Sequence, residues 1–425
     1  MNEIIKELVE DCLAKTNPIK RVLEHSNDFI KNATILYKLG YISKNIYERL
    51  CKDGLYHDIG KCNDKMQLRL HTSCNNKRIK FDDTIEVPHN VLSFEMLDRN
   101  DFDSDEDYYR TLYIVLNHHS YIDNNEYITN PQNSELIKET LKQFNIVPLS
   151  KTKIKKYYTY IDNNLTNEII FEKGLVHKCD YAASGESTIE YENNFLDNAM
   201  IQMYNRRSFQ KNDLQLFCEN NSEKNLCIIA QTGMGKTEAA LLWGKNNKII
   251  YFLPLRVSIN AIYDRIKKEV LCNENIENRL GLLHSNSLEK LTLDEVNLLE
   301  EDENFKCLRH YNESKNLSLP LSISTIDQLF TFVYKYPTYE LNVANLAISK
   351  LIIDEIQAFD AKLFADLVYG LEFLSNFNTK ILITTATLAP YLKNILFKNI
   401  PFETKTFIND DIKRHNLKVI DDKLN

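Results

Sequence analysis

The sequence predicts an α-helical domain over residues 1–205, followed over residues 206–425 by an α/β lobe with a mainly parallel sheet. In the first part, apolar residues recur at the three- and four-residue spacing of helices, as from Val22 to Tyr37. From Leu226 the pattern changes to short apolar runs that alternate with helical stretches, which is typical of a parallel sheet covered by helices. A length of 425 residues accommodates two or three domains.

The composition favours a cytoplasmic protein. Nine cysteines are scattered without a Cys-x-x-Cys pair, which favours free thiols in a reducing cytosol over disulfides or a structural zinc site. The first residues include acids, and no apolar run approaches the roughly 18 residues of a membrane helix, so we expect no signal peptide and no membrane contact. The net charge of −8 argues against broad nucleic-acid binding but allows a local basic path.

Apolar spacing and breaker residues place the elements of the helical part. Residues 4–13 and 22–37 are expected to be helices, and Gly40 ends the second. Further helices are expected around the histidines at 57, 89, 118 and 119. Loops are expected at 63–83 and 100–107, an irregular segment broken by Pro131 and Pro148 at 121–173, with 157–161 open between strand and helix, and a linking segment at 184–221.

Candidate metal ligands recur through the helical part. Six of the ten histidines fall in five short stretches. The candidate ligands in these stretches are His25, His57, Asp58, His89, His118, His119 and Asp180. Imidazole and carboxylate together suit divalent metals such as manganese, iron, cobalt, nickel or zinc. We do not expect His177, which lies in the last stretch, to bind metal.

The adjacent pair His57-Asp58 suggests two metal ions. Neighbouring residues on a helix point about 100° apart, so Asp58 can bridge two ions while His57 binds one. Two ions roughly 3.5–4 Å apart clamp the attacking and leaving oxygens of a phosphodiester and activate a bound water. Lys61 can neutralise a phosphate oxygen as a point charge. The pattern therefore predicts a two-metal phosphohydrolase in which Asp58 and Lys61 are catalytic.

The five stretches resemble the HD superfamily of metal-dependent phosphohydrolases, and more narrowly the HD nuclease of the CRISPR-associated helicase–nuclease family. The doublet His118-His119 and the string Asp180-Tyr181-Ala182-Ala183-Ser184 favour this branch over HD enzymes that cleave nucleotides. The resemblance implies that the seven candidate ligands hold two transition-metal ions, namely manganese, iron, cobalt or nickel.

The α/β part begins with a phosphate-binding loop. A buried-strand pattern at 226–230 is followed by Gln231-Thr232-Gly233-Met234-Gly235-Lys236-Thr237 and then by a helical run. Gly233 and Gly235 let the backbone N–H groups face phosphate. Lys236 reaches the β- and γ-phosphates, and Thr237 places its hydroxyl on Mg²⁺. Although Ala230 replaces the first glycine of the consensus, we expect this part to bind ATP and magnesium.

Further strands and helices alternate after this loop. Strands are expected at 248–253, 281–284, 319–324, 351–353 and 381–383, and helices at 257–270, 289–306, 325–336 and 362–376. Asp354-Glu355 follows one of these strands, where a Walker B pair belongs. Asp354 would hold Mg²⁺ through water, and Glu355 would activate the attacking water as a catalytic residue.

These motifs resemble the first RecA-like lobe of superfamily 2 helicases. Pro254-Leu255-Arg256 resembles motif Ia, Ser324-Thr325 begins a string that resembles motif Ib, and Thr385-Ala386-Thr387 resembles motif III. The resemblance implies that Arg256 and Thr325 lie on the nucleic-acid backbone, and that Thr385 and Thr387 couple ATP hydrolysis to it.

Two glutamines complete the resemblance. Gln215 resembles the adenine-reading glutamine of the Q motif, with an ordinary surface glutamine as the alternative. Gln357 occupies a position where many relatives carry histidine. It can hydrogen-bond the γ-phosphate or motif III, but it cannot titrate near neutral pH.

An HD nuclease followed by this lobe resembles the helicase–nuclease of type I CRISPR systems. That resemblance implies recruitment by Cascade, a crRNA-guided surveillance complex, and degradation of single-stranded DNA driven by ATP hydrolysis. Full-length relatives carry a second RecA-like lobe, and the stretch after Thr387 is too short for one. We therefore expect a second helicase lobe to be missing or on a separate chain. The chain alone should bind ATP weakly, should not translocate, and should cut DNA without ATP.

Two other functions remain open from the sequence. One is an HD phosphohydrolase of nucleotides with a regulatory ATPase lobe, which requires a closed nucleotide pocket. The other is a non-enzymatic interaction subunit, against which the intact Lys236, Asp354 and Glu355 argue.

Overall fold

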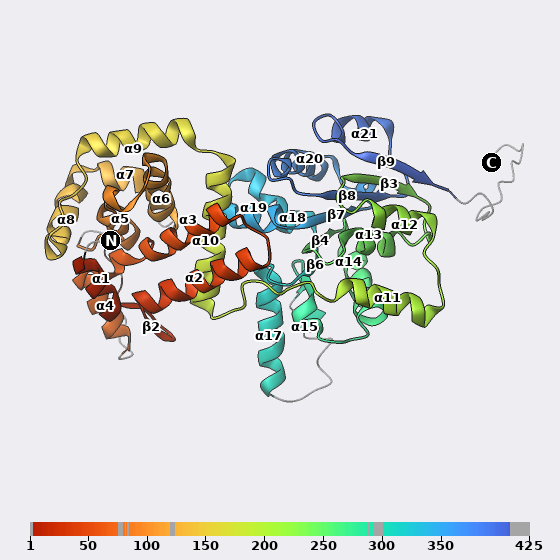
Figure 1. The fold of residues 1–425 in the computed structure, drawn as a ribbon, viewed down its shortest axis with the longest axis horizontal. Coiled ribbons are helices and arrows are strands. Elements are labelled where there is room, and N and C mark those ends of the chain that lie inside the picture. The colour runs from red at the N-terminus through yellow and green to blue at the C-terminus, as the bar shows by residue number, and fades with distance from the viewer. Residues whose placement is uncertain are drawn as a thin grey trace, which may run out of the picture.

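The computed structural model describes residues 3–74, 80, 82, 85–119, 124–287, 290–291 and 301–408. A helical part lies beside an α/β part that contains a parallel sheet, which confirms the predicted fold class (Figure 1). No helix within these residues is both long enough and apolar enough to cross a membrane.

The N-terminal part consists of helices and one short antiparallel hairpin. The hairpin joins β1 Leu13–Thr16 to β2 Ile19–Arg21. The helices are α1 Glu3–Asp11, α2 Val22–Lys38, α3 Lys44–Tyr56, α4 Asp64–Cys74, α5 His89–Met96, α6 Asp105–Asn117, α7 Asn124–Thr129, α8 Pro131–Leu141, α9 Lys151–Asn164 and α10 Asn167–Gly185.

Local sequence sets the ends of the helices that carry candidate ligands. Ser43 caps α3 by accepting a hydrogen bond from the backbone N–H of Ile46. Ser104 caps α6 in the same way. The acidic residues at 105–107 interact favourably with the positive end of this helix's dipole. Both helices end just before a histidine, so that His57 and His118 occupy the C-cap positions. Their side chains therefore lie where the chain leaves the helix.

The C-terminal part surrounds a seven-stranded sheet of order β5-β6-β4-β7-β8-β3-β9, in which every neighbouring pair is parallel. The strands are β3 Leu226–Ala230, β4 Ile249–Phe252, β5 Leu280–Leu283, β6 Leu321–Ser324, β7 Lys350–Asp354, β8 Ile381–Thr385 and β9 Glu403–Phe407. The helices are α11 Leu196–Arg207, α12 Asp213–Asn220, α13 Lys236–Gly244, α14 Arg256–Arg265, α15 Ile276–Arg279, α17 Glu301–Lys315, α18 Ile326–Leu329, α19 Tyr339–Ala347, α20 Ala361–Ser375 and α21 Pro390–Leu396.

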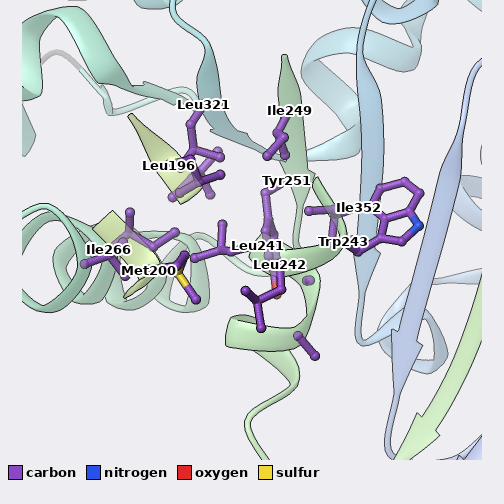
Figure 2. Close-up of a cluster of buried hydrophobic side chains, with 14 of the residues drawn as sticks. Leu196, Met200, Leu241, Leu242, Trp243, Ile249, Tyr251, Ile266, Leu321 and Ile352 are labelled. Atoms are coloured by element: carbon purple, nitrogen blue, oxygen red, sulfur yellow. The ribbon is translucent and has the colours of Figure 1, made fainter. Parts of the chain in front are cut away.

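Helices cover both faces of this sheet, which explains why its strands are apolar without alternation. Along β4, Ile249 and Tyr251 pack into one core cluster with Trp243 of α13, as Figure 2 shows. Ile250 and Phe252 point the other way, into a second cluster with α20. Because β7, β8 and β3 are neighbours, the loops that follow them meet at one edge of the sheet.

The two parts meet where α10 packs against α19. Gly174 allows the close approach, because a Cβ there would lie 2.0 Å from the carbonyl oxygen of Glu340. Lys173 Nζ donates to Glu340 Oε1 at 2.8 Å, and Lys178 Nζ donates to Asn345 Oδ1 at 2.7 Å. The helix that carries Asp180 is thereby held against the α/β part.

Several segments of the helical part differ from the sequence-based expectations. The expected loop at 63–83 contains α4, and the expected irregular segment at 121–173 contains α7, α8 and α9, so 157–161 is helical. Pro131 does not break a helix but begins one, because proline is tolerated in the first turn. The first helix ends at Asp11, since Leu13 already pairs in the hairpin. Residues 75–79, 81, 83–84 and 120–123 lie outside the described residues.

The α/β part also differs in places. The expected helix at 325–336 divides into α18 and a 3₁₀ turn at Phe330–Tyr334, and the one at 257–270 ends in a π-helical turn at Ile266–Val270. Neither α19, α21 nor β9 was predicted. Of the expected helix at 289–306, residues 289 and 292–300 lie outside the described residues, and α17 begins at Glu301.

The expected domain boundary at 205/206 falls inside α11. Together with α12, that helix lies in the expected linking segment at 184–221. Leu196, Met200 and Met203 recur at helical spacing on α11 and pack into the core of the α/β part. The core of the α/β part therefore already includes α11, and the change from the helical part to the α/β part lies between α10 and α11.

Replacing Gly174 with alanine should force α10 and α19 apart. The new Cβ would meet a backbone oxygen, which cannot move as a flexible side chain can, so we expect a destabilisation of about 1–3 kcal/mol in the free energy of unfolding. The matched control is Gly185→Ala on the same helix, where a Cβ meets only Ser187 Oγ at 3.6 Å. Chemical denaturation measures both variants, and equal stabilities would contradict the close packing.

Candidate metal centre and nucleotide site

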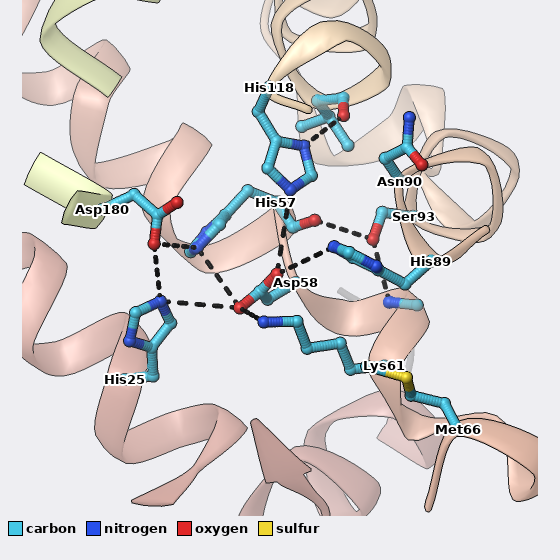
Figure 3. A network of polar contacts seen from close by, with 12 residues as sticks. His25, His57, Asp58, Lys61, Met66, His89, Asn90, Ser93, His118 and Asp180 are labelled. Carbon is cyan, nitrogen blue, oxygen red and sulfur yellow. Dashed lines mark hydrogen bonds and ion pairs between the residues drawn. The ribbon is translucent and has the colours of Figure 1, made fainter. Parts of the chain in front are cut away.

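Candidate metal ligands from five helical segments converge in the N-terminal part (Figure 3). His25 lies on α2, while His57 and Asp58 follow α3 directly. His89 begins α5, and Asp180 lies on α10. The doublet at 118–119 follows α6.

All seven predicted ligands fall in two adjacent groups. The ligand atoms within each group lie within 4.8 Å of one another. One group consists of His25, His57 and Asp180, and the other consists of Asp58, His89, His118 and His119. His177 lies in neither group, although it is buried nearby on α10.

Asp58 lies between the two groups, and each of its oxygens faces one of them. Its Oδ2 is 3.5 Å from Nε2 of both His25 and His57. Its Oδ1 is 3.5 Å from Nε2 of His89 and 3.8 Å from Nε2 of His118. A carboxylate in this position can bridge two cations, because each oxygen offers a lone pair to a different set of imidazoles.

Backbone contacts fix the orientation of two imidazole rings. His57 Nδ1 lies 2.9 Å from the carbonyl oxygen of Gly54, and His118 Nδ1 lies 2.6 Å from that of Val115. Donation from Nδ1 leaves Nε2 as the lone-pair nitrogen of each ring, which is the form that binds metal. In both residues this Nε2 faces Asp58.

Hydrogen bonds from α5 tie the segments together. Ser93 Oγ donates to the carbonyl oxygen of His57 and accepts from the backbone N–H of Gly60, both at 2.9 Å. Asn90 Nδ2 donates to the carbonyl oxygen of Leu116 at 2.6 Å. These bonds hold α5 against the ends of α3 and α6, and so place His89 beside the other ligands.

The buried polar atoms of this centre fit a pair of metal ions. Nε2 of His57, His89 and His118 and Oδ1 of Asp58 are buried and lack a hydrogen-bond partner within the described residues. Buried polar atoms without partners are costly, and here four of them face one another. A divalent cation between imidazole and carboxylate would satisfy them, so the donor set fits transition metals.

Burial sets the protonation states that metal binding requires. It lowers the pKa of His57 to about 4 and that of His119 to about 3, so both imidazoles are neutral near pH 7. Burial would raise the pKa of Asp58, but the charge of Lys61 holds it well below its ordinary value. Lys61 Nζ donates to Asp58 Oδ2 at 2.7 Å. The centre therefore combines neutral imidazoles with an ionised carboxylate.

A second site lies at the edge of the sheet, in a cavity of ≈ 550 Å³. Every residue predicted to bind ATP or magnesium lines it: Gln215, Thr232, Gly233, Gly235, Lys236, Thr237, Asp354 and Glu355. Gly233 and Gly235 have φ values of 84° and 81°, a conformation that glycine adopts without strain. The loop curls in this way from the end of β3 to the start of α13, as expected for a phosphate-binding loop.

Gln215 is buried beside this loop, which excludes the alternative of an ordinary surface glutamine. Its Oε1 accepts from the backbone N–H of Asn212 at 3.0 Å, as part of a capping box at the start of α12. Because the oxygen is used, Nε2 faces the loop, and a Cβ on Gly235 would lie 2.4 Å from it. The side-chain N–H group of Gln215 is thus the part that faces the cavity.

The carboxylates of the site are held by neighbouring strands. Asp354 Oδ2 accepts from Tyr251 Oη at 2.8 Å, and its Oδ1 accepts from Thr384 Oγ1 at 2.6 Å. Glu355 Oε1 forms an ion pair with Lys236 Nζ at 2.9 Å. This contact places the acid that follows β7 against the lysine that follows β3.

Gln357 connects this acid to the next strand. Its Nε2 donates to Glu355 Oε2, and its Oε1 accepts from the hydroxyl of Thr385 at the end of β8. Thr387 N in turn donates to Thr385 Oγ1 at 3.3 Å. The glutamine thus makes the contact to motif III that its position suggested, and it does so without a titratable group.

Three comparisons relate this geometry to known proteins. A family model described as DEAD/DEAH box helicase matches residues 207–395. The putative CRISPR-associated nuclease/helicase Cas3 of Methanocaldococcus jannaschii is 30% identical over 206 residues, which are 46% of this chain and 27% of that protein. The CRISPR-associated nuclease/helicase Cas3 of Methanothermobacter thermautotrophicus is 27% identical over 235 residues, which are 54% of this chain and 27% of that protein.

A solved structure extends the likeness to the helical part. The crystal structure of T. fusca Cas3 is similar with a TM-score of 0.57 at 16% identity, over 90% of this chain and 50% of that one. The chain is thus similar to Cas3 proteins, in sequence over about half of its length and in fold over most of it. This confirms the resemblance expected from the motifs, and the chain spans about half the length of this solved relative.

The residues expected on nucleic acid differ in their exposure. Arg256, in the string that resembles motif Ia, is exposed. Thr387, which is expected to couple ATP hydrolysis to nucleic acid, is exposed as well. Thr325 is buried, and its hydroxyl lacks a hydrogen-bond partner within the described residues. The side chain of Thr325 therefore does not reach the surface in this conformation, so at most its backbone is presented there.

Sequence reasoning missed the residues that hold the ligands in place. Tyr251 and Thr384, which bind Asp354, lie inside strands, where nothing distinguishes them from other buried residues. Ser93 and Asn90 follow His89 on α5. The sequence feature that could have indicated them was a polar residue on the buried side of a short helix.

Metal should stabilise the chain through the group of residues around Asp58. Metal-free protein mixed with Mn²⁺ at about 100 times its Kd should gain about 2.7 kcal/mol, since only the folded state binds. Asp58→Ala should lose this gain, whereas Asp162→Ala, an exposed aspartate on α9, should keep it. Thermal unfolding by circular dichroism measures the gain. An equal gain in both variants would place the metal elsewhere.

Proposed function

We propose that the chain is the nuclease and ATP-binding portion of a CRISPR interference helicase–nuclease. Its helical domain would hydrolyse phosphodiesters of single-stranded DNA, and its α/β lobe would bind magnesium and ATP. The observation that carries the nuclease proposal is Asp58, whose two oxygens face separate groups of histidines. The family relationship supports both activities.

The residues of the metal centre have separate roles in this proposal. His25, His57 and Asp180 would hold one ion, the second group would hold the other, and Asp58 would bridge them. Two bound ions would supply an activated water and would polarise the phosphodiester. The contact with Asp58 holds the side chain of Lys61 at the metal centre. There the charge of Lys61 would neutralise a phosphate oxygen. The metal would be manganese, iron, cobalt or nickel.

The residues of the nucleotide site would form one half of a site for ATP hydrolysis, the half that contacts one side of the nucleotide. Lys236 and Thr237 would contact the phosphates and Mg²⁺, Asp354 would hold that ion through water, and Glu355 would orient the attacking water. The contact from Gln357 to Thr385 would relay the state of the γ-phosphate to motif III. We infer that a second RecA-like lobe, on the same or another chain, completes the motor.

The proposed partners follow from the family. A crRNA-guided Cascade complex would deliver a displaced single strand, and Arg256 together with the backbone at Thr325 would contact the DNA backbone. The exposed position of Arg256 supports this assignment.

Cutting of circular single-stranded DNA tests the nuclease proposal. With Mn²⁺, Co²⁺ or Ni²⁺ and without ATP, the chain should linearise the circle, because the metal centre is formed without the nucleotide. Asp58→Ala should lose at least about 100-fold in rate, since it removes the bridge between the ions. Gel electrophoresis of the products measures the loss. Hydrolysis of free nucleotides without any cutting of DNA would instead indicate a nucleotide phosphohydrolase.

Nucleotide binding should depend on Lys236 and leave the nuclease untouched. Lys236→Ala removes the positive charge that would contact the β- and γ-phosphates. We therefore expect at least 10-fold weaker binding of a fluorescent ATP analogue. The same variant should cut DNA without ATP at the rate of the original chain. A matched fall in both activities would show that the substitution disturbs the fold rather than the site.

A further inference from the structure

A second buried polar cluster lies in the helical part, outside the metal centre. It consists of Asp53 on α3, Arg110 on α6 and Glu172 on α10, and all three side chains are almost completely buried. Arg110 Nη1 donates to Glu172 Oε1, and it lies 3.6 Å from Asp53 Oδ2. One guanidinium therefore joins three helices.

The same three helices carry candidate metal ligands. Asp53 precedes His57 by four residues, Arg110 precedes His118 by eight, and Glu172 precedes Asp180 by eight. Separations of four and eight residues are about one and two helical turns. The charged residue thus precedes the ligand by about one turn on α3 and by about two turns on α6 and α10.

An apolar layer separates the two polar clusters. Ile114 and Val176, four residues before His118 and Asp180, are buried together with Phe29. Phe29 stands four residues after His25 on α2, and its ring packs on Gly54, where a Cβ would lie 2.4 Å from its Cδ1. This ligand-bearing helix, α2, therefore packs through an apolar contact, whereas α3, α6 and α10 are joined by charge.

Stability alone does not account for this cluster. Burying an arginine and two carboxylates is costly, and well-packed apolar residues in place of a buried ion cluster often leave stability unchanged or improve it. A charged cluster differs from an apolar one in its directionality. A guanidinium binds carboxylates in its own plane, so a shift of one residue along a helix, about 1.5 Å, would break its contacts.

We propose that Arg110, through Asp53 and Glu172, is a positioning residue that sets the axial register of three ligand-bearing helices and thereby the geometry of the metal centre. This inference rests on the proposed two-metal function. It assigns Arg110 no contact with metal or substrate, and it predicts that metal affinity and fold stability respond differently when the cluster is neutralised.

The test is a triple variant, Asp53→Asn, Arg110→Met and Glu172→Gln, which removes every charge of the trio at nearly constant volume. Calorimetric titration of Mn²⁺ into the metal-free full chain gives the number of ions and their affinities, and chemical denaturation gives stability. We expect the triple variant to remain folded and to bind Mn²⁺ 10–100-fold more weakly, as is typical when groups that orient metal ligands are altered.

The matched control is the double variant Lys173→Met and Glu340→Gln. It removes another buried ion pair of α10, at 2.8 Å, on the face that packs against α19. Within the described residues this pair forms no ion pair with another ligand-bearing helix, and its one ring contact there is distant, with Lys173 Nζ 5.9 Å from the ring centre of Tyr113 on α6. Metal affinity should therefore stay within about twofold of the original chain. A loss equal to that of the triple variant would overturn the inference, because any disturbance of α10 would then suffice.

A single substitution decides the outcome if the triple variant does not fold. Arg110→Lys keeps the charge but loses the planar fork, so we expect a folded chain with weaker Mn²⁺ binding. Unchanged affinity in Arg110→Lys, or in a folded triple variant, overturns the role of Arg110. Mn²⁺ binding by the original chain is measured first, before any variant is made. Failure of that chain to bind two ions would refute the proposed function itself.

Discussion

The structure of the helical domain depends on the convergence of imidazole nitrogens on one carboxylate. Four Nε2 atoms lie 3.5–3.8 Å from the oxygens of Asp58, and three of them are buried without a hydrogen-bond partner in the described part of the chain. Such an arrangement is costly unless cations fill it. The helix ends, the backbone bonds to His57 and His118, and the contacts of Ser93 all serve to hold these atoms facing one another.

The α/β part uses a different device to gather its site. Because β3, β8 and β7 are neighbours in a parallel sheet, the loops after them meet without help from distant residues. Lys236 and Glu355 follow β3 and β7, and Thr385 ends β8. Lys236 pairs with Glu355, and Gln357 connects Glu355 to Thr385. Since α10 packs on α19, the candidate metal centre and the nucleotide site are built on parts that contact each other through a buried ion pair.

Motifs were easier to predict from the sequence than the structure around them. The phosphate-binding loop and Asp354 were predictable because each follows a short apolar run at a strand end. The seven candidate metal ligands were identified by residue type, and the adjacency of His57 and Asp58 suggested that Asp58 lies between two ions. Which histidines accompany each side of Asp58 was not predicted. By contrast, α7, α8 and α9 were missed because their sequence is polar and because Pro131 and Pro148 were expected to break helices. The helix α11 was missed because its apolar residues face a sheet that is distant in sequence. The contacts of Tyr251 and Arg110 could not be predicted from the sequence, because only tertiary packing brings these residues to their partners.

The most direct test of the account is a crystal structure of the chain loaded with Mn²⁺, with anomalous scattering used to locate the ions. The account predicts two peaks, roughly 3.5–4 Å apart, on either side of the Asp58 carboxylate. One would lie against His25, His57 and Asp180, and the other against the histidines at 89, 118 and 119. A single peak, or two peaks that do not share Asp58, would contradict the two-metal centre.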